Sequence, residues 1–382
     1  MKKQSPKIIN TKLASIWRKE KLRNIAPLRG GFAFKSEKFQ NTGIPIVRIS
    51  NIKFDGTVGG EFECYSKIIS DEKFVLRGRS ILLAMSGATT GKIAMLDSEE
   101  EYYQNQRVGY FQNTGEVDYD FLSSVLQTKA FTNQLNGVLV AGAQPNISSK
   151  EIDSFEFCIP DSIDEQSAIG SLFRTLDDLL ASYKDNLINY QSLKATMLSK
   201  MFPKAGQTVP EIRLDGFEED WERKSLSEVC TINSGRDYKH LKNGDIPVYG
   251  TGGYMLSVNE KLSDEDAIGI GRKGTIDKPY LLSSPFWTVD TLFYVICKVG
   301  YDLNYLFLIF QKIRWKKFDE STGVPSLSKK TIEKVVSKFP SYEEQQAIGS
   351  YSSNLDNLIN SHQEKISQLE TLKKKLLQDM FI

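Results

Sequence analysis

The feature that most limits the folding of this chain is a long sequence that occurs twice. EQSAIGSLFRTLDDLL begins at Glu165, and EQQAIGSYSSNLDNLI begins 179 positions later, at Glu344, in a chain of 382 residues. Aligned without a gap, residues 165–202 and 344–381 are identical at about 15 of 38 positions, and the copies end in LSKMF and LQDMF. A spacing of nearly half the chain indicates a repeat the size of a domain.

Each copy predicts one long amphipathic helix. Apolar residues recur at steps of three and four, and the two stripes are Ile169, Leu172, Leu176, Leu179, Tyr183, Leu187, Tyr190, Leu193, Met197 and Met201, and Ile348, Tyr351, Leu355, Leu358, His362, Ile366, Leu369, Leu372, Leu376 and Met380. Both stripes contain two consecutive steps of four, around Tyr183 and His362, which predicts a shared phase break. A helix of about 38 residues is about 57 Å long, and its narrow apolar seam needs a partner helix. We therefore expect the two helices to pack on each other, the alternative being core helices of unrelated domains.

Composition and charge restrict the partners. The net charge is +1, but the first 80 residues hold about 17 Lys/Arg against about 7 Asp/Glu, while DSEEE at 97–101 and DGFEEDWE at 215–222 are acidic. This segregation allows a nucleic-acid partner, and a solvated basic surface is the alternative. The four cysteines form no CxxC pair, so we expect buried free thiols and no metal. With neither a long apolar run nor a signal peptide, the chain is expected to be soluble and cytoplasmic.

The segments outside the helices predict two α+β heads. Short β-like runs separated by Gly, Asn and Asp fill residues 1–160 and 208–340, and each half adds an amphipathic helical stretch. The halves are distant copies, because Trp17 and Trp221, Gly31 and Gly235, and the phrases GIPIVRISN and GDIPVYGTG stand at matching places. Both tryptophans are expected to be core anchors.

Catalytic motifs are absent from the sequence. SILLAMSGATTGKIAML resembles a phosphate loop, but Gly87 and Gly91 bracket three residues where four are needed, and Ile93 follows Lys92 where a hydroxyl belongs. Neither metalloprotease, hydrolase nor dinucleotide-binding motifs occur, so we expect no enzyme activity and no cofactor. A basic Gly turn is predicted to be the element common to both heads, with Gly91 and Lys92 matching Arg272, Lys273 and Gly274.

The whole chain resembles the specificity subunit of a type I DNA restriction–modification system. The resemblance is carried by the duplicated EQ.AIG...LD.LI helices together with MFPKAGQTVPEIRLDGFEEDWERKSLSEV, GIPIVRISNI and GRKGTIDKP. It implies two pseudo-symmetric α/β target-recognition domains, at 1–160 and 208–340. Between them it implies two long antiparallel helices forming a coiled coil, at 161–207 and 341–382. It further implies a bipartite, asymmetric site in double-stranded DNA, two modification (adenine methyltransferase) subunits, and restriction subunits in the full complex, with no membrane partner. The helices would act as a ruler, so that four residues added to each should lengthen the unread spacer by roughly two base pairs.

Candidate DNA contacts are the residue types that read base edges or hold phosphates. In the first head they are Arg48, Asn51, Ser86, Thr89, Thr90, Lys92, Gln104, Asn105, Gln106 and Arg107. In the second head they are Arg236, Tyr238, Lys239, Tyr249, Thr251, Tyr254, Arg272, Lys273 and Thr275. For each of them, a turn residue or a solvated cation is the alternative.

The EQ.AIG starts of the helices are candidate contacts for the modification subunits. The residues are Glu165, Gln166, Glu344 and Gln345, and a helix-capping role for the first pair is the alternative. Two rival functions remain open at this stage. They are a DNA-modifying enzyme with unrecognised motifs, which would transfer methyl groups by itself, and a coiled-coil adaptor, which would bind no DNA site.

Overall fold

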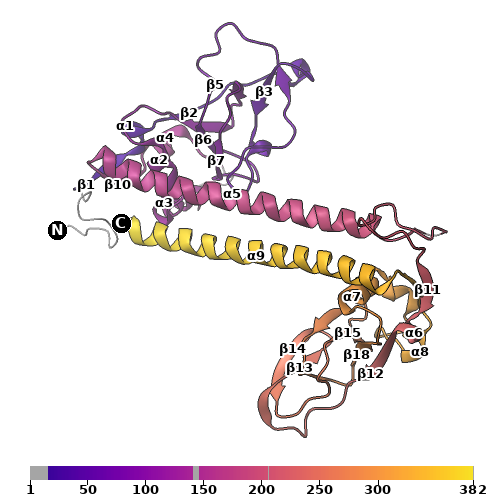
Figure 1. The fold of residues 1–382 in the computed structure, drawn as a ribbon. Helices are drawn as coiled ribbons and strands as arrows, with labels where there is room; N and C mark the ends of the chain where they lie inside the picture. Colours follow the sequence, from indigo (N-terminus) through magenta and orange to yellow (C-terminus); the bar gives the residue numbers. More distant parts are fainter. Residues whose placement is uncertain (1–15, 141–145, 205, 382) are drawn as a thin grey trace. The chain divides into compact units, whose positions relative to one another are not determined.

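The described part of the chain divides into two compact units. The computed structural model describes residues 16–140, 146–204 and 206–381, so the first 15 of the 80 residues with an excess of Lys and Arg lie outside the described residues. Unit 1 comprises the chain up to residue 183 together with residues from 365 onward, and unit 2 comprises residues 184–364. Each unit consists of one α+β head and parts of two long helices, α5 (Ile163–Lys200) and α9 (Tyr342–Met380), the latter drawn in yellow and orange in Figure 1.

The two long helices form the expected coiled coil, but through a more regular seam than the sequence suggested. The residues turned away from solvent recur in alternating steps of four and three: Ile169, Phe173, Leu176, Leu180, Tyr183, Leu187, Tyr190, Lys194, Met197 and Met201 in the first copy, and Ile348, Ser352, Leu355, Ile359, His362, Ile366, Leu369, Lys373, Leu376 and Met380 in the second. Every member of the second set lies 179 positions after its counterpart. Such alternation is an unbroken heptad repeat.

The predicted phase break is therefore wrong. Leu172, Leu179 and Leu193, which the apolar stripe places in the seam, are 39%, 42% and 41% exposed, and Leu358 and Leu372 are 40% and 45% exposed. The seam passes one residue further along the chain, through Phe173 and Leu180. Two adjacent lines of apolar residues run along each helix, and stepping between them produced the apparent break.

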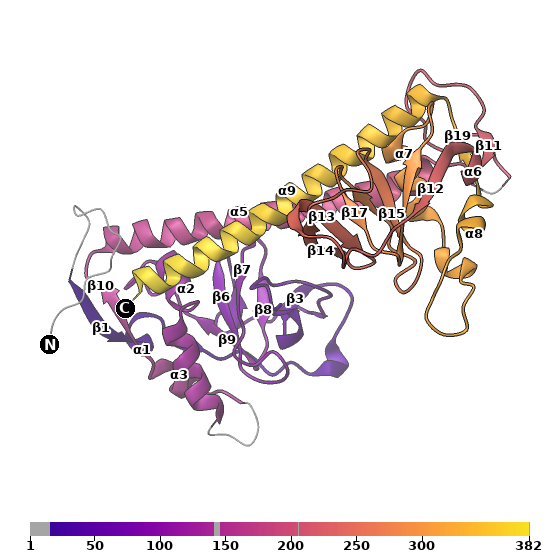
Figure 2. The ribbon, with the colours of Figure 1, turned by 90° about the horizontal axis from the view of Figure 1, so that it is seen from below.

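The strands of the unit 1 head pair into two four-stranded sheets and a separate two-stranded ribbon. The strands are β1 (Trp17–Lys21), β2 (Leu28–Arg29), β3 (Ile44–Val47), β4 (Cys64–Tyr65), β5 (Val75–Leu76), β6 (Ser80–Ala84), β7 (Ile93–Leu96), β8 (Tyr102–Gln104), β9 (Val108–Phe111) and β10 (Glu156–Pro160). The sheet orders are β2-β9-β6-β7 and β4-β3-β8-β5, while β1 pairs with β10. All pairs are antiparallel except β3 with β8, which run parallel and place the turns after both strands at one edge. Figure 2 shows β6, β7, β8 and β9 lying together.

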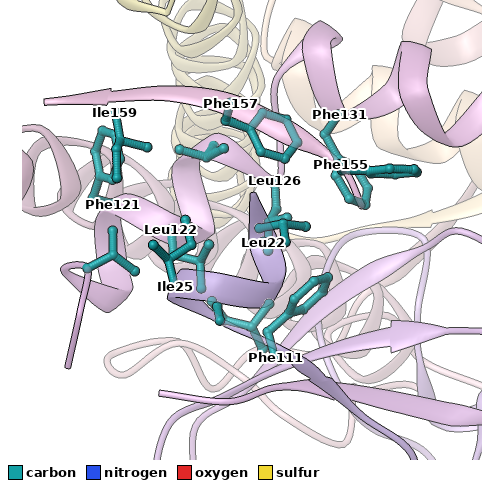
Figure 3. Close-up of a cluster of buried hydrophobic side chains, with 14 of the residues drawn as sticks. Leu22, Ile25, Phe111, Phe121, Leu122, Leu126, Phe131, Phe155, Phe157 and Ile159 are labelled. Carbon is teal, nitrogen blue, oxygen red and sulfur yellow. The ribbon is translucent and has the colours of Figure 1, made fainter. Parts of the chain in front are cut away.

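The core of unit 1 lies between the head and the long helices. The head's helices are α1 (Leu22–Ile25), α2 (Tyr119–Val125), α3 (Lys129–Val140) and α4 (Ser149–Asp153), with short 3-10 turns η1 (Ser36–Lys38) and η2 (Ile49–Asn51). Figure 3 shows side chains from α1, α2, β9 and β10 gathered around Leu22, Phe121 and Ile159, each fully buried. The same cluster includes Ile169 of α5 and Met380 of α9, so the head and both helices share one core.

Unit 2 repeats this plan. Its strands are β11 (Glu222–Ser225), β12 (Cys230–Ser234), β13 (Asn243–Gly250), β14 (Gly253–Val258), β15 (Ala267–Gly271), β16 (Tyr280–Leu282), β17 (Trp287–Thr288), β18 (Leu292–Cys297) and β19 (Val336–Phe339). Its shorter helical elements are α6 (Leu226–Val229), α7 (Leu303–Lys312), η3 (Trp315–Phe318) and α8 (Lys329–Glu333). The sheet orders are β12-β18-β15-β16, β14-β13-β17 and β11-β19, with β13 and β17 parallel.

The two tryptophans at matching places pack in the hydrophobic cores of their units, as predicted. Trp221 is 3% exposed in the unit 2 core and packs on Phe202 and Tyr305. Trp17 is half-buried and packs on Phe121 and Phe381 in unit 1. Across the described residues, no helix combines the length and apolarity needed to cross a membrane.

Candidate nucleic-acid interface

Three turns of the unit 1 head meet at one edge, and they carry the candidates of that head. The turns follow β3, β6 and β8 and span residues 48–51, 85–92 and 105–107. The backbone N–H of Asn105 donates to the carbonyl of Val47 at 3.1 Å, and that of Met85 donates to the carbonyl of Arg107 at 2.9 Å. Residues that are remote in sequence are thus held side by side by main-chain bonds, which leaves the side chains to vary.

Side-chain bonds tighten the same cluster. The Thr89 hydroxyl donates to the Ile49 carbonyl at 3.1 Å, and the Arg107 guanidinium donates to the Ser86 hydroxyl at 3.0 Å. Ser86 is 4% exposed, so it supports Arg107 from beneath. Lys92, Gln106 and Arg107 are exposed. At this edge, two cations and an amide therefore face the solvent, and the hydrogen-bonded turns beneath hold them in place.

The unit 2 head builds the same edge with different side chains. The N–H of Arg236 donates to the Thr288 carbonyl at 2.8 Å, that of Val289 to the Tyr249 carbonyl at 3.0 Å, and that of Arg272 to the Thr291 carbonyl at 2.8 Å. The candidates exposed here are Arg236, Lys239, Tyr254, Arg272 and Lys273, while Tyr238, Tyr249, Thr251 and Thr275 are half-buried.

The matching bonds correct one predicted correspondence. Met85 N–H to Arg107 in unit 1 corresponds to Arg272 N–H to Thr291 in unit 2, and Ser86 and Lys273 each form an isolated bridge to the segment before α4 or α8. Gly87 and Gly274 follow these residues, with φ of 80° and 95°. The glycine common to this turn is therefore Gly87, because it directly follows the bridging residue as Gly274 does, whereas Gly91, also with a positive φ, lies four residues further on. The predicted match of Gly91 and Lys92 is wrong, since Lys92 already leads into β7.

Three predicted DNA contacts are buried instead: Ser86, which lies under Arg107, and Asn51 and Gln104. Asn51 is 1% exposed, and its amide bonds to the N–H of Arg48 and to the carbonyls of Gly59 and Glu61, which closes the η2 turn. Gln104 is fully buried, and its amide is satisfied by Arg29 and by the Val108 carbonyl. These side chains hold turns together and cannot reach a base. Their polar character gave no sign of this, because internal and external hydrogen bonds need the same groups.

Arg48 and the remaining candidates of unit 1 have intermediate environments. Arg48 is half-buried, 3.6 Å from the carboxylate of Glu63 and 5.8 Å from the ring centroid of Phe39. Thr90 is half-buried and donates to the Gly87 carbonyl at 2.6 Å. Asn105 is half-buried and accepts from the Arg107 N–H at 3.3 Å. These residues border the exposed group.

The sequence did not single out one exposed aromatic residue at this edge. Phe54, on the turn directly after η2, is 73% exposed, and the Lys92 ammonium lies 4.8 Å from its ring centroid. Its place in KFDGT, just before an Asp-Gly turn, is the only sequence signal for exposure. In unit 2, Tyr254 is 63% exposed beside a glycine turn that the Tyr280 hydroxyl holds through the Gly250 carbonyl at 2.6 Å. Burial raises the pKa of Tyr280, so it remains a neutral donor.

The four residues predicted to contact partner subunits are buried within the chain, which corrects that prediction. Glu165, Gln166 and Glu344 are each 1% exposed and Gln345 is 2% exposed. Gln166 accepts from the Asp118 N–H at 2.9 Å and donates to the Pro160 carbonyl at 2.8 Å. Gln345 makes the same two bonds to Asp302 and Pro340, at 3.2 and 3.0 Å.

The two glutamates complete these joints in different ways. Glu165 accepts from the Trp17 indole N–H at 3.2 Å, whereas Glu344 pairs with Arg213 at 2.7 Å, which raises the pKa of that guanidinium. The glycine of the motif has a matching purpose, because a Cβ at Gly170 would lie 2.4 Å from the Phe121 backbone nitrogen. The EQ.AIG motif therefore fastens each head to its helix; it is neither a partner surface nor a simple cap.

The thiols have a structural environment. All four cysteines are free, and burial raises the pKa of Cys230 and of Cys297 to about 12, so neither is a reactive thiolate. Among the residues that the structure describes, no group of three or more His, Cys, Asp or Glu side chains could hold a metal ion.

Comparison with known proteins points to one family. The family model described as "Type I restriction modification DNA specificity domain" matches residues 15–190 and 218–371. The type I restriction enzyme MjaVIII specificity subunit of Methanocaldococcus jannaschii is 22% identical over 351 residues, covering 81% of this chain and 80% of that protein.

One solved structure shares the fold. The crystal structure of the type I restriction–modification S subunit from M. genitalium aligns with a TM-score of 0.70 at 18% identity, over 99% of both chains. The HsdS subunit from Thermoanaerobacter tengcongensis aligns over 96% of both chains with a TM-score of 0.41 and 16% identity.

Proposed function

This chain belongs to the type I restriction–modification DNA specificity family, and from that premise we propose that it reads a bipartite, asymmetric DNA site with a fixed unread spacer. A specificity subunit is the DNA-recognition subunit of its system and has no catalytic activity of its own. In this proposal residues 1–160 and 208–340 are the target-recognition domains, and residues 161–207 and 341–382 are the helices with their connecting segment.

One observation carries the proposal: the two heads use equivalent backbone frames to present unequal side chains. Arg272 and Lys273 occupy the places that Met85 and Ser86 hold in unit 1. A symmetric dimer would read two equal half-sites, whereas one chain with unequal heads reads two different ones. The asymmetry of the DNA site thus follows from the asymmetry of the turns.

The exposed members of each cluster are the proposed DNA contacts. In unit 1 they are Lys92, Gln106 and Arg107, bordered by Arg48, Thr89, Thr90 and Asn105. In unit 2 they are Arg236, Lys239, Tyr254, Arg272 and Lys273, bordered by Tyr238, Tyr249, Thr251 and Thr275. Arginine and lysine hold phosphates or guanine edges, and amides read adenine, so both clusters suit a major-groove edge.

The exposed leucines of the long helices are the proposed docking sites for the modification subunits. Leu179 and Leu372 lie in unit 1, and Leu358 and Leu193, their counterparts 179 positions away, lie in unit 2. All four occupy the same heptad position beside the seam. Isolated exposed leucines are ordinary, but a pair repeated at equivalent places supports two equivalent docking sites, hence two modification subunits per chain. Restriction subunits join this assembly in the full complex.

The proposed docking of the modification subunits is tested by replacing one pair of these leucines with glutamate. Leu179→Glu combined with Leu372→Glu should reduce the complex from two modification subunits to one, as counted by native mass spectrometry. Ile188→Glu is the matched control, because Ile188 is 62% exposed on α5 away from that heptad line. An unchanged stoichiometry in the double variant would contradict this assignment.

The DNA-reading part is tested by sequencing methylated adenines with and without this gene. Deletion should remove methylation from one gapped motif and leave every other motif unchanged. In a variant that combines Arg272→Ala with Lys273→Ala, the half of the methylated motif read by unit 2 should become less specific in sequence. The other half should be unchanged. Methyl transfer by the purified chain alone, or no motif lost on deletion, would contradict the proposal.

A further inference from the structure

Phe54 is a large apolar side chain held in solvent beside the proposed DNA contacts of unit 1. It is 73% exposed, at the tip of the turn formed by residues 53–57. One exposed phenylalanine needs no explanation on its own. What distinguishes this one is the way its turn is built and the cation next to it.

The turn that carries Phe54 is held in place by hydrogen bonds. The Lys53 N–H donates to the Thr57 carbonyl at 2.9 Å, and the Asp55 carboxylate accepts from the Thr57 N–H and hydroxyl at 3.0 and 2.7 Å. The Gly56 carbonyl accepts from the Met95 N–H at 3.0 Å, which ties the turn to β7. These bonds fix the backbone of the turn and so keep the backbone of Phe54 at the surface of the head.

The Lys92 ammonium restricts how the ring can meet DNA. It lies 4.8 Å from the ring centroid, so one face of the ring is covered by a cation. A full stack between two base pairs would use both faces of the ring, and one face is already occupied. The arrangement instead leaves an apolar edge and one face for contact with a base edge, while Lys92 supplies charge for a nearby phosphate.

The neighbouring turns indicate which base edge is involved. The Phe54 turn directly follows residues 48–51, and Thr89 bonds to the Ile49 carbonyl at 3.1 Å. The cations and amides of this cluster suit donor and acceptor groups in the major groove. The one apolar group on a base edge there is the 5-methyl group of thymine, a known partner for phenylalanine side chains.

We propose that Phe54 contacts the methyl group of a thymine in the half-site read by unit 1, and so helps to determine its specificity. The inference rests on the proposed DNA-reading function and extends it to a residue and a chemical group. It predicts that this half-site contains at least one A·T pair at which the methyl group, and not only the pairing, is recognised.

The test measures binding of the assembled modification complex to duplexes in which single thymines of the motif are replaced by deoxyuridine. With the unaltered chain, one replacement should weaken binding roughly fourfold, the factor expected for one buried methyl group. With Phe54→Ala, binding should already be weaker, and that same replacement should have no further effect. Phe54→Leu should restore part of the sensitivity.

The control is Ile69→Ala, since Ile69 is 98% exposed in the same head outside the three turns. It should keep the full deoxyuridine effect. Equal sensitivity in Phe54→Ala and the unaltered chain, or a half-site without an A·T pair, would overturn the inference. Absence of motif-specific binding by the unaltered complex would instead contradict the proposed function itself.

Discussion

The ammonium of Lys194 on α5 lies 2.5 Å from a carboxylate oxygen of Asp356 on α9, inside the seam of unit 2. Lys373 on α9 pairs with Asp177 on α5 in unit 1, so the two bridges are exchanged by the 179-residue repeat. Both lysine side chains are 16% exposed, whereas the aspartates are about 40% exposed. Each bridge places a cation at a seam position, which fixes which residues of the two helices face each other.

Removing one partner of this bridge should destabilise the chain. Asp356→Ala leaves Lys194 largely buried without its counter-charge, and we predict a loss of about 1–2 kcal/mol in the free energy of unfolding. Urea unfolding measures this, with Asp185→Ala on the exposed side of α5 as control. Replacing the pair together, Lys194→Leu with Asp356→Ala, should recover most of the loss. A double variant as unstable as the single one would contradict this account of the bridge.

The head-to-helix joints should not tolerate a methyl group. At Gly170 an added Cβ would lie 2.4 Å from a backbone nitrogen of α2, so Gly170→Ala should lower unfolding stability by about 1–3 kcal/mol. Gly137, inside α3, has open space around it, and Gly137→Ala should be neutral or stabilising by about 0.5–1 kcal/mol. Thermal unfolding of both variants checks the contrast. Equal effects would mean that the close approach is not maintained.

Ser352 places an unpaired hydroxyl group at a buried position of the seam. It is 5% exposed, its hydroxyl has no hydrogen-bond partner, and its counterpart in the first copy is Phe173. Ser352→Ala removes the unpaired group, so we predict a gain of about 1 kcal/mol in urea unfolding. Ser167→Ala, which deletes a 2.7 Å bond to Asp118, should have the opposite sign. A loss of stability in Ser352→Ala would show that the hydroxyl is satisfied.

Acidification should weaken unit 1 through Asp71. The Lys67 ammonium, 2.9 Å away, holds the pKa of this carboxyl below 3.8, its ordinary value, and the Tyr103 hydroxyl donates to it at 3.0 Å. Because the folded-state pKa is depressed, its stabilisation is fully present above pH 3.8 and is lost as the pH falls through the lower folded value. The difference in melting temperature between Asp71→Asn and the unaltered chain should therefore shrink from pH 7 to pH 2.5. A constant difference would contradict the assignment.

Sequence reasoning identified the helices and their pairing but misplaced the seam. Two apolar lines one residue apart run along each helix, and Ser352 interrupts the correct line while Leu358 and Leu372 reinforce the other. Only the burial of the side chains in the structure distinguishes the seam from the other apolar line. Repetition makes the EQ.AIG motif visible in the sequence. Its partners Asp118 and Asp302, however, stand about 45 residues earlier in the chain, and no local pattern connects them to the motif.

The sequence predicts which residues could contact DNA, but not which of them lie together on one surface. The sequence could not show that the turns after β3, β6 and β8 converge, because this depends on the parallel pairing of β3 with β8. It also could not separate Gln104, whose amide is used up inside the head, from Gln106 two residues later, which is exposed. Phe54 is not among the predicted contacts, because those are residues with hydrogen-bonding or charged groups.

The central claim, that the helices set the distance between two readers, is tested most directly by lengthening both. The unbroken heptad means that seven residues, and not four, must be inserted at equivalent places in α5 and α9, so that the seam and both Lys–Asp bridges are kept. Seven residues add about 10.5 Å, or about three base pairs. Sequencing of methylated adenines should then find the same two half-motifs with a gap about three base pairs longer. An active complex that methylates the original motif with an unchanged gap would contradict the account.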